Sequence, residues 1–398
     1  MSLMFYDEVL DAPSVLRDGT HRAATLDATW ARFAKARRTA EITRIAELTG
    51  LDTLGVPVFA AIRPMGRSLS TQQGKGISAE AARVSALMES LETWTAEQVA
   101  TNPAIAITRG SYRDLRARAI DVRHLPRPRG RLDVDARWKW VRGWDLVQQR
   151  ELLVPLEAVT LDTTFTKAPV FDISSNGLAS GNVRVEAIVH GLCEVIERDA
   201  EAAWRRAGTD RRILLDSITS PIVQVLLARI SAAGARVFVW DLGGPLADTV
   251  AAIGCAIMED PSEPAWRTLG FYQGFGAHLV PEVAIARALT EAAQTRLTYI
   301  AGARDDFFPF DYARATDPEL LADIWERVTA PCDEPVLFED LPRSTTRGLG
   351  EDLETIVDRL RAHAIGSVVA VDLTHPALRV PVVKVLVPGL ATDLEAMG

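Results

Sequence analysis

The sequence predicts an α/β protein of the mixed α+β kind, and three observations lead to this fold class. Segments with the apolar spacing of helices alternate along the chain with short runs typical of buried strands. Hydrophobic residues make up 48% of the chain and charged residues 24%, the balance of an ordinary globular protein. The chain has 398 residues and no proline-rich or Ser/Gly-rich linker, so we expect two or three closely packed subdomains.

The first half of the chain contains two predicted helices and three predicted strands. A helix begins near Thr25, and 56–62 is a short apolar run typical of a buried strand. A long helix follows Ser78, which is suited to cap its start, and apolar residues recur at helical spacing to about Gln98. The predicted elements are helices 25–35 and 78–98 and strands 56–62, 137–145 and 152–154.

The second half continues the alternation. A second long helix follows the loop SSNGLASGN, and a third begins at Pro281. The predicted elements are helices 183–206, 220–233, 281–301 and 353–364 and strands 236–240, 249–258, 367–372 and 380–387. This order is typical of a protein that mixes helices with sheets.

The charge balance excludes several classes of function. A net charge of −9 and a pI near 5.3 argue against a nucleic-acid partner, because phosphate backbones are bound mainly by clustered Lys and Arg. The basic segment 113–130 is interrupted by Asp and apolar residues, so we interpret it as a solvated helix and loop, with a ligand or peptide contact as the alternative.

The location of the protein is expected to be the cytoplasm. No apolar run reaches the ~18 residues of a membrane span, and no secretory signal precedes the first helix. Cys193, Cys255 and Cys332 are far apart and lack metal-ligand spacing, which suits reduced thiols and gives no reason to propose a zinc site.

The stretch STQQGKGIS, residues 70–78, contains the Gly-Lys pair of a phosphate-binding loop but not its spacing. The nearest upstream glycine, Gly66, is too far from Gly74 to close a Walker nest, and Lys75 is followed by Gly76 instead of Ser or Thr. The segment is therefore interpreted as a glycine-rich turn before a helix.

Two of the long helices carry narrow acidic stripes on otherwise apolar surfaces. On the first helix the stripe consists of Ser85, Glu89 and Glu92, and on the second of Asn182, Glu186, His190, Glu194 and Glu197. Either pair of glutamates alone is most often a surface salt-bridge face. Buried carboxylates without partners are costly, however, and two such helices can share divalent cations. Oxygen ligands favour magnesium, which is normally shared with substrate phosphates, so the stripes predict a nucleotide. For His190 we expect a satisfied helix histidine.

The third long helix adds positive charge. Arg287, Glu291 and Gln294 share one face, Arg296 is close by, and Arg304 follows the helix. Arginine near a phosphate would neutralise charge during phosphoryl transfer. An ordinary amphipathic surface is the alternative for this helix.

Four segments carry a resemblance to a known family: GKGISAEAARVSALMESLE, SSNGLASGNVRVEAIVHGLCEVIERDA, ARALTEAAQTRL and VPVVKVLVPGL. With the spacings S-x-x-x-E-x-x-E and N-x-x-x-E-x(7)-E-x-x-E-R, they resemble the YcaO family, ATP-dependent enzymes that activate peptide backbone amides. The resemblance spans about residues 22–390. It implies a YcaO-type fold with the ATP site between long helices, in which 61–398 form the YcaO domain and 1–60 a segment that contributes to the nucleotide site.

The resemblance also implies the site residues, with ATP and Mg²⁺ as cofactors at a non-Walker site for two metal ions. The implied metal ligands are Glu89, Glu92, Glu186, Glu194 and Glu197. The implied nucleotide contacts are Arg22, Thr29, Lys75, Ser85, Asn182, Arg198, Gln294 and Arg296. The expected catalytic residues are Glu194, Glu197 and Arg296, with Arg287 and Arg304 as alternatives to Arg296. Ala179 stands where some members have Ser, so that contact is missing or is provided by Ser180.

The family reaction begins when a nucleophile adds to a peptide carbonyl, whose oxygen then takes the γ-phosphoryl group of ATP. The segment GARDD resembles the subgroup that works with a TfuA partner, in which sulfide is the nucleophile and a thioamide results. We therefore expect thioamidation of a peptide or protein substrate, a TfuA-like partner and a homodimer. An azoline-forming cyclodehydratase is the first alternative, although its proline-alternating tail is missing from LVPGLATDLEAMG. A catalytically idle ATP-binding scaffold is the second.

Overall fold

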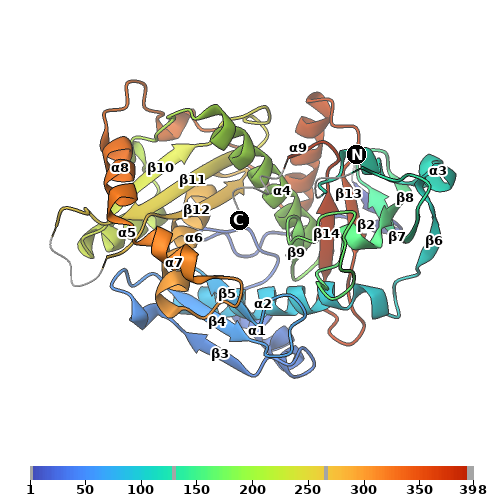
Figure 1. The fold of residues 1–398 in the computed structure, drawn as a ribbon. Coiled ribbons are helices and arrows are strands. Elements are labelled where there is room, and N and C mark those ends of the chain that lie inside the picture. The colour runs from blue at the N-terminus through green and yellow to red at the C-terminus, as the bar shows by residue number, and fades with distance from the viewer. Residues whose placement is uncertain (1–2, 128–130, 264–267, 392–398) are drawn as a thin grey trace.

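The computed structural model describes residues 3–127, 131–263 and 268–391, and in this part of the chain helices and antiparallel sheets alternate. The mixed α+β class is therefore confirmed. The described residues form two three-stranded sheets, one six-stranded sheet and one two-stranded sheet. Figure 1 shows helix α4 (Arg184–Ala207) between two of the larger sheets. None of the helices in the described ranges combines the length and apolar character needed to cross a membrane.

The first three-stranded sheet supports helix α2. Its antiparallel strands are β3 (Arg44–Glu47), β4 (Val58–Ile62) and β5 (Thr71–Lys75). Helix α2 (Ala79–Glu97) begins after Ser78, whose side chain accepts the N–H of Ala81, as predicted. The expected glycine turn at 70–78 is wrong, since residues 71–75 form a buried strand. Gly74 is required there because a Cβ atom would lie 1.9 Å from the backbone N of Ala86.

The second three-stranded sheet repeats this arrangement. Its antiparallel strands are β10 (Arg236–Asp241), β11 (Ala251–Met258) and β12 (Tyr272–His278), followed by helix α6 (Pro281–Ala301). The Gln-Gly-x-Gly sequence at 273–276 corresponds to the one at 73–76. A Cβ atom at Gly274 would lie 2.2 Å from the backbone N of Ala292, so α6 packs on β12 as closely as α2 packs on β5.

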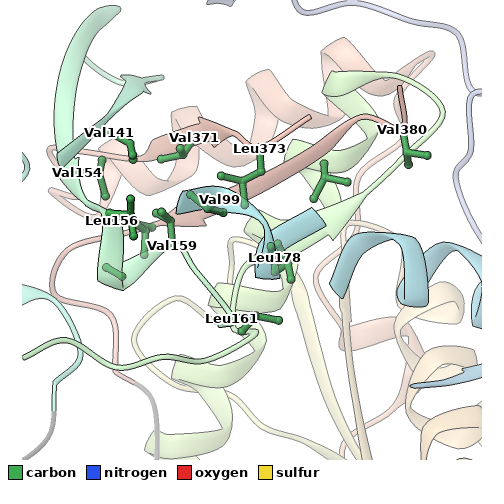
Figure 2. Packing of buried hydrophobic residues seen from close by; sticks show 14 of the residues in the cluster. Val99, Val141, Val154, Leu156, Val159, Leu161, Leu178, Val371, Leu373 and Val380 are labelled. Carbon is green, nitrogen blue, oxygen red and sulfur yellow. The ribbon is translucent and has the colours of Figure 1, made fainter. Parts of the chain in front are cut away.

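The six-stranded sheet forms the third body and contains the largest apolar cluster. Its strands are β6 (Thr108–Ser111), β7 (Arg137–Asp145), β8 (Arg150–Pro155), β9 (Leu178–Ser180), β13 (Val369–Asp372) and β14 (Val382–Leu386). Figure 2 shows Val141, Val154 and Val371 of this sheet packed against Leu156 and Val159 from the loop that follows β8. Each fully buried side chain of this kind contributes about 1.5–3 kcal/mol.

Helix α4 (Arg184–Ala207) lies between the second three-stranded sheet and the six-stranded sheet (Figure 1). It contacts β11 and β12 on one side and β9 and β14 on the other. Apolar residues surround its acidic stripe because both neighbouring sheets pack against it. Gly208, in the left-handed region at φ 62°, ends the helix.

The remaining described helices and strands complete these three bodies. They are β1 (Met4–Phe5), β2 (Glu8–Val9), α1 (Leu26–Phe33), α3 (Tyr112–Leu115), α5 (Pro221–Ala232), α7 (Pro309–Ala315), α8 (Pro318–Thr329) and α9 (Leu349–Ala362). Short 3₁₀ turns connect several of them. The expected loop at 113–130 extends to 128–130, outside the described residues. Cys193, Cys255 and Cys332 carry free thiols.

Candidate nucleotide and metal site

The carboxylates of α2 and α4 face one another. The pKa of Glu92 lies well above its usual range, first because the side chain is buried and then because the charges of Glu89 and Glu194 oppose its ionisation. Glu92 is therefore close to one carboxylate on its own helix and one on α4. Hydrogen bonding with Ser180 of β9 partly lowers the pKa again. The two acidic stripes converge in the folded protein.

Glu194 and Glu197 continue this group of carboxylates along α4. Burial raises the pKa of Glu197 to about 7, although the guanidinium of Arg198 favours the ionised form. Its Oε2 atom is buried and has no hydrogen-bond partner among the described residues. Burial also raises the pKa of Glu194. We call Glu89, Glu92, Glu194 and Glu197 the acid cluster.

Glu89 shows that solvent reaches the acid cluster. Its side chain is exposed to solvent. Its pKa is nevertheless raised because the surrounding protein removes part of the water around the carboxylate, while the charges of Lys75 and Arg304 lower the pKa. Protein therefore surrounds the carboxylate on most sides while one side stays open to solvent. Perturbed carboxyl groups of this kind are typical of binding sites.

The acid cluster fits an open magnesium site instead of a closed protein cage. In the ranges that the structure describes, no three acidic, histidine or cysteine side chains are close enough to hold a metal ion by themselves. Mg²⁺ usually takes one or two protein carboxylates and completes its shell with water and substrate phosphates. The partnerless Oε2 of Glu197 is one oxygen that such a cation would satisfy.

Lys75 approaches from β5 and is held by Glu291 of α6. Lys75 Nζ donates to Glu291 Oε2 at 2.5 Å, and the N–H of Phe275 donates to Oε1 at 3.3 Å. Burial would raise the pKa of Glu291, but the charges of Lys75 and Arg198 outweigh burial and hold the pKa at about 2. Glu291 is therefore ionised and fixes the Lys75 ammonium group.

Glu291 was not among the predicted site residues, although a signal for it exists in the sequence. After the repeated Gln-Gly-x-Gly, Arg287, Glu291 and Gln294 repeat on α6 the i, i+4, i+7 spacing that Ser85 and the two following glutamates have on α2. The glycine contacts match Ala292 of α6 with Ala86 of α2, so in the folded units Glu291 stands where Ser85 stands.

Arg287 is the arginine of α6 that faces the acid cluster. Its charge favours the ionised forms of Glu89, Glu194 and Glu197. Its Nε atom is buried and donates to no partner in the described part of the chain. Arg304 also acts on Glu89, although its guanidinium is paired with Asp306.

Arg296, the arginine preferred from the sequence, is engaged with other carboxylates in the structure. Arg296 is fully buried, and its guanidinium binds Asp52 at 2.8 and 2.9 Å and Glu259 at 2.8 Å. The two carboxylates therefore balance its charge, and these ion pairs hold α6 in place. Gln294 is also engaged in packing, because its Nε2 donates to the carbonyl of Gln73 at 2.9 Å.

The N-terminal segment meets the start of α4. Arg22 Nη1 donates to Glu186 Oε1 at 3.2 Å, and the N–H of Ala23 donates to Oε2 at 3.0 Å. Thr29 Oγ1 donates to Asn182 Oδ1 at 3.0 Å. The structure therefore brings Arg22 and Thr29 together with Asn182 and Glu186. Both oxygens of Glu186 already accept protein hydrogen bonds, unlike Oε2 of Glu197.

His190 marks a concentration of positive charge beside the acid cluster. Its pKa lies well below the usual range, first because of burial and then because of Arg287, Arg22 and Lys75. These cations reach it from three different parts of the chain. Its Nδ1 atom is buried without a partner among the described residues, so the expectation of a satisfied histidine is wrong. The three cations fit an anionic polyphosphate.

Ser85 and Arg198 complete the predicted set. Ser85 is partly buried on α2, one turn before Glu89. Arg198 Nη1 donates to Glu201 Oε2 at 2.9 Å, and Nη2 lies 3.9 Å from Glu197 Oε1. Arg198 thus borders the acid cluster while it is anchored one turn further along α4.

One further charged residue beside the cluster was not predicted. Lys384 is 2% exposed on β14, and its charge interacts with Glu194 and Glu92. The signal in the sequence is a single lysine within the valine-rich run VPVVKVLV. A charged side chain in a fully buried strand requires a specific reason.

Acidic helices that meet three converging cations define a class of protein that binds a polyphosphate nucleotide together with divalent metal ions. The family model described as YcaO cyclodehydratase, ATP- and Mg²⁺-binding, matches residues 73–391. The chain belongs to the YcaO family. Its cofactors are ATP and Mg²⁺, and it is an ATP-dependent enzyme of the YcaO type.

Relatives extend over nearly the whole chain. A protein from Rhizobium leguminosarum bv. trifolii, described as uncharacterized and in the tfuA 3′ region, is 37% identical over 382 residues, which are 94% of this chain and 89% of the relative. An uncharacterized protein from Methanothermobacter thermautotrophicus is 35% identical over 90% of this chain and 92% of its own length.

Solved structures share the fold. YcaO from Methanopyrus kandleri, bound with AMPPCP and Mg²⁺, has a TM-score of 0.74 and 26% identity, and the match covers 96% of this chain and 95% of that one. A heterocyclase in complex with substrate and cofactor has a TM-score of 0.80 and 23% identity. The match covers 97% of this chain and 54% of that heterocyclase, and at this level of identity the likeness concerns the fold alone.

Proposed function

We propose that the protein uses ATP and Mg²⁺ to activate a peptide backbone amide and convert it to a thioamide, with a TfuA-like partner. One observation carries the ATP-dependent part: the acid cluster of α2 and α4 lies beside cations from three separate segments, Arg22, Lys75 and Arg287. The relative in the tfuA 3′ region supports the thioamide as product.

The proposed roles follow from the placement of each side chain. The glutamates of the acid cluster and Glu186 hold magnesium, and Lys75, Arg198, Arg287 and Arg22 bind phosphate oxygens. Ser85, Thr29 and Asn182 are further nucleotide contacts. Bound ATP supplies the phosphoryl group that takes up the amide oxygen, and Mg²⁺ neutralises its charge. Glu291 keeps Lys75 in place, and we assign the catalytic arginine to Arg287 in place of Arg296.

The reaction balances with hydrosulfide as nucleophile. The amide oxygen bonds to the γ-phosphorus as the β–γ phosphoanhydride bond of ATP breaks and ADP leaves. A C–S bond forms at the amide carbon, and the C–O bond breaks as the oxygen leaves on the former γ-phosphoryl group, as phosphate. The proton of hydrosulfide ends on the released phosphate. No electrons are exchanged with an outside donor. The chain therefore needs to bind and orient the reactants and to neutralise charge, which its arginines, lysines and carboxylates are suited to do.

The test is product mass together with phosphate release. The full chain, a TfuA-like partner, sulfide, Mg-ATP and a peptide substrate should release phosphate and give a peptide heavier by the difference between sulfur and oxygen. Glu194→Ala should abolish both signals because it removes a carboxylate from the acid cluster. Peptide that stays at its original mass while the wild-type chain hydrolyses ATP would contradict the proposal.

The same experiment tests two alternative functions. The family description names a cyclodehydratase, which favours azoline formation as the second candidate, and its product would be lighter by one water. A chain that binds Mg-ATP but releases no phosphate with any substrate would be an idle scaffold. The acid cluster, assembled from two helices, argues for turnover.

We also infer a homodimer from the resemblance to the family. Light scattering of the purified chain should give twice the mass of one chain. A mass equal to that of a single chain across the working concentration range would contradict the inference.

A further inference from the structure

A small cavity lies at β14, where the loop before β9, the segment 125–126 and Val195 of α4 complete its wall. Its volume is about 30 Å³. Cavities of ~10–15 Å³ already hold a water molecule, whereas pockets for ordinary organic ligands measure ~300–1,000 Å³. The cavity is therefore sized for water-like molecules. Apolar side chains, among them Leu125, Val195 and Leu386, form much of its wall.

Lys384 brings positive charge to this cavity. Its Nζ donates to the carbonyl of Ser174 at 2.5 Å, and among the described residues this is its one hydrogen bond. No carboxylate in the described ranges lies within ion-pair distance of it. Burial lowers the pKa of Lys384 to about 8. A buried ammonium group with two N–H groups unused is costly unless a ligand accepts from it.

Two acceptors face the same cavity from the loop before β9. Asp172 and Asn176 both line it. The Oδ2 atom of Asp172 and the Oδ1 atom of Asn176 are buried and have no partners among the described residues. Together with Lys384 they give the cavity wall one donor and two acceptors. A ligand that fits must accept through one atom and donate through one or two hydrogens.

The cavity lies beside the reaction site proposed above. The charge of Lys384 interacts with Glu194 and Glu92 of the acid cluster. Val195, which lines the cavity, follows Glu194 on α4. Lys384 also pairs in the sheet with Leu178 of β9, two residues before Ser180, which hydrogen-bonds with Glu92. A small molecule bound at Lys384 is therefore close enough to the acid cluster to be influenced by its charge.

We propose that the Lys384 cavity, formed by Lys384, Asp172 and Asn176, binds the small nucleophile as hydrogen sulfide or its hydrosulfide anion. The sulfur accepts an N–H of Lys384, and the S–H groups donate to Asp172 Oδ2 or Asn176 Oδ1. This assignment rests on the proposed thioamidation. Lys384 favours the anion, from which the C–S bond forms at the amide carbon as the C–O bond breaks, with the proton passing to phosphate.

Bromide, an anion of similar size to hydrosulfide, tests the site without turnover. Crystals of the full chain soaked in sodium bromide should show an anomalous peak within hydrogen-bond distance of Lys384 Nζ. Lys384→Met should remove the peak, and Asp172→Asn should strengthen it because a competing negative charge is lost. No peak in the wild-type crystal overturns the proposal. A peak that persists in Lys384→Met means an adventitious ion only and also overturns it.

Kinetic measurements then test the role of the cavity separately from the overall reaction. Lys384→Met should raise the KM for sulfide by about tenfold or more, because a hydrogen bond from a charged donor is lost. Its affinity for Mg-ATP by calorimetry should not weaken, since loss of a cation beside Glu194 and Glu92 cannot disfavour a bound metal ion. Lys139→Met, at a residue that does not line the cavity, is the matched control and should keep the wild-type KM.

Failure of the cavity assignment and failure of the proposed thioamidation give different results. If the wild-type chain makes thioamide and Lys384→Met has the same KM for sulfide, the cavity assignment is overturned and the proposed function stands. If bromide binds in wild type and not in Lys384→Met, but no peptide gains sulfur, the small-anion site stands and thioamidation fails.

Discussion

Single residues on α6 divide into binding and structural roles, although they share one helix. Arg287 has a buried Nε without a partner among the described residues and acts on the carboxylates of the acid cluster. Arg296 is fully buried and binds Asp52 and Glu259. An unpaired guanidinium is available to a ligand, whereas a doubly paired one stabilises the fold.

This division gives opposite expectations for two substitutions. Arg287→Ala should weaken Mg-ATP binding by about tenfold or more while the free energy of unfolding changes little, because a charged hydrogen-bond donor to phosphate is lost. Arg296→Ala should lower the free energy of unfolding by about 3–5 kcal/mol, because a buried ion pair with Asp52 and Glu259 is broken. Calorimetric titration and urea denaturation measure the two effects. Wild-type affinity in Arg287→Ala would refute the assignment.

At the scale of elements, two hairpin-and-helix units present their helices to the site. In each unit a strand that contains glycine allows the helix to lie directly on the backbone of the sheet. The glycines are Gly74 below α2 and Gly274 below α6. This close packing aligns the polar face of each helix with the end of its strand. Lys75 of one unit can therefore meet Glu291 of the other.

Gly74→Ala is expected to disrupt the first unit. Its Cβ atom would lie 1.9 Å from the backbone N of Ala86, a contact that only a shift of α2 can relieve. We expect a loss of more than about 3 kcal/mol in the free energy of unfolding, measured by urea denaturation. Gly366→Ala is the control, since nothing lies within 4 Å of its Cβ position. Equal midpoints for the two variants would contradict this account of the packing.

The sequence predicted the long helices well, because their apolar spacing and the capping Ser78 are local signals. Helix 281–301 was predicted with its observed bounds. Strands β5 and β12 were not predicted, since glycine and glutamine have low strand propensity and only the packed helix explains the glycines. Spacing also placed the acidic stripes. The spacing could not tell the roles of Arg287 and Arg296 apart. Arg296 pairs with Asp52, which is far away in the sequence, so its structural role depends on the folded chain.

At the scale of the whole molecule, the site lies where all three sheet-containing bodies meet. Helix α2 belongs to the first body and α6 to the second, while α4 and Lys384 connect them to the six-stranded sheet. Like charges from different bodies face one another in the acid cluster. Without bound cations, ionisation of this cluster therefore opposes the association of the bodies.

The metal-free protein should accordingly lose stability as the pH rises. Folded Glu197 keeps its proton up to a pKa of about 7, whereas the ordinary value is 4.5. Protonation stabilises the folded state, so this contribution is present below about pH 4.5 and is lost by about pH 7, amounting to about 3 kcal/mol. Urea denaturation in EDTA across this range should show the decline, and Glu197→Gln should flatten it. A wild-type profile that rises over the same interval would contradict the account.

The wide spacing of the site along the chain has a consequence for biosynthesis. Contributions come from Arg22 near the beginning, from Glu194 in the middle, and from Glu291 and Lys384 late in the sequence. During translation the early segments can fold as local units, but the ribosome must release the chain as far as Lys384 before these residues meet. A nascent chain that ends before Lys384 therefore lacks a complete site.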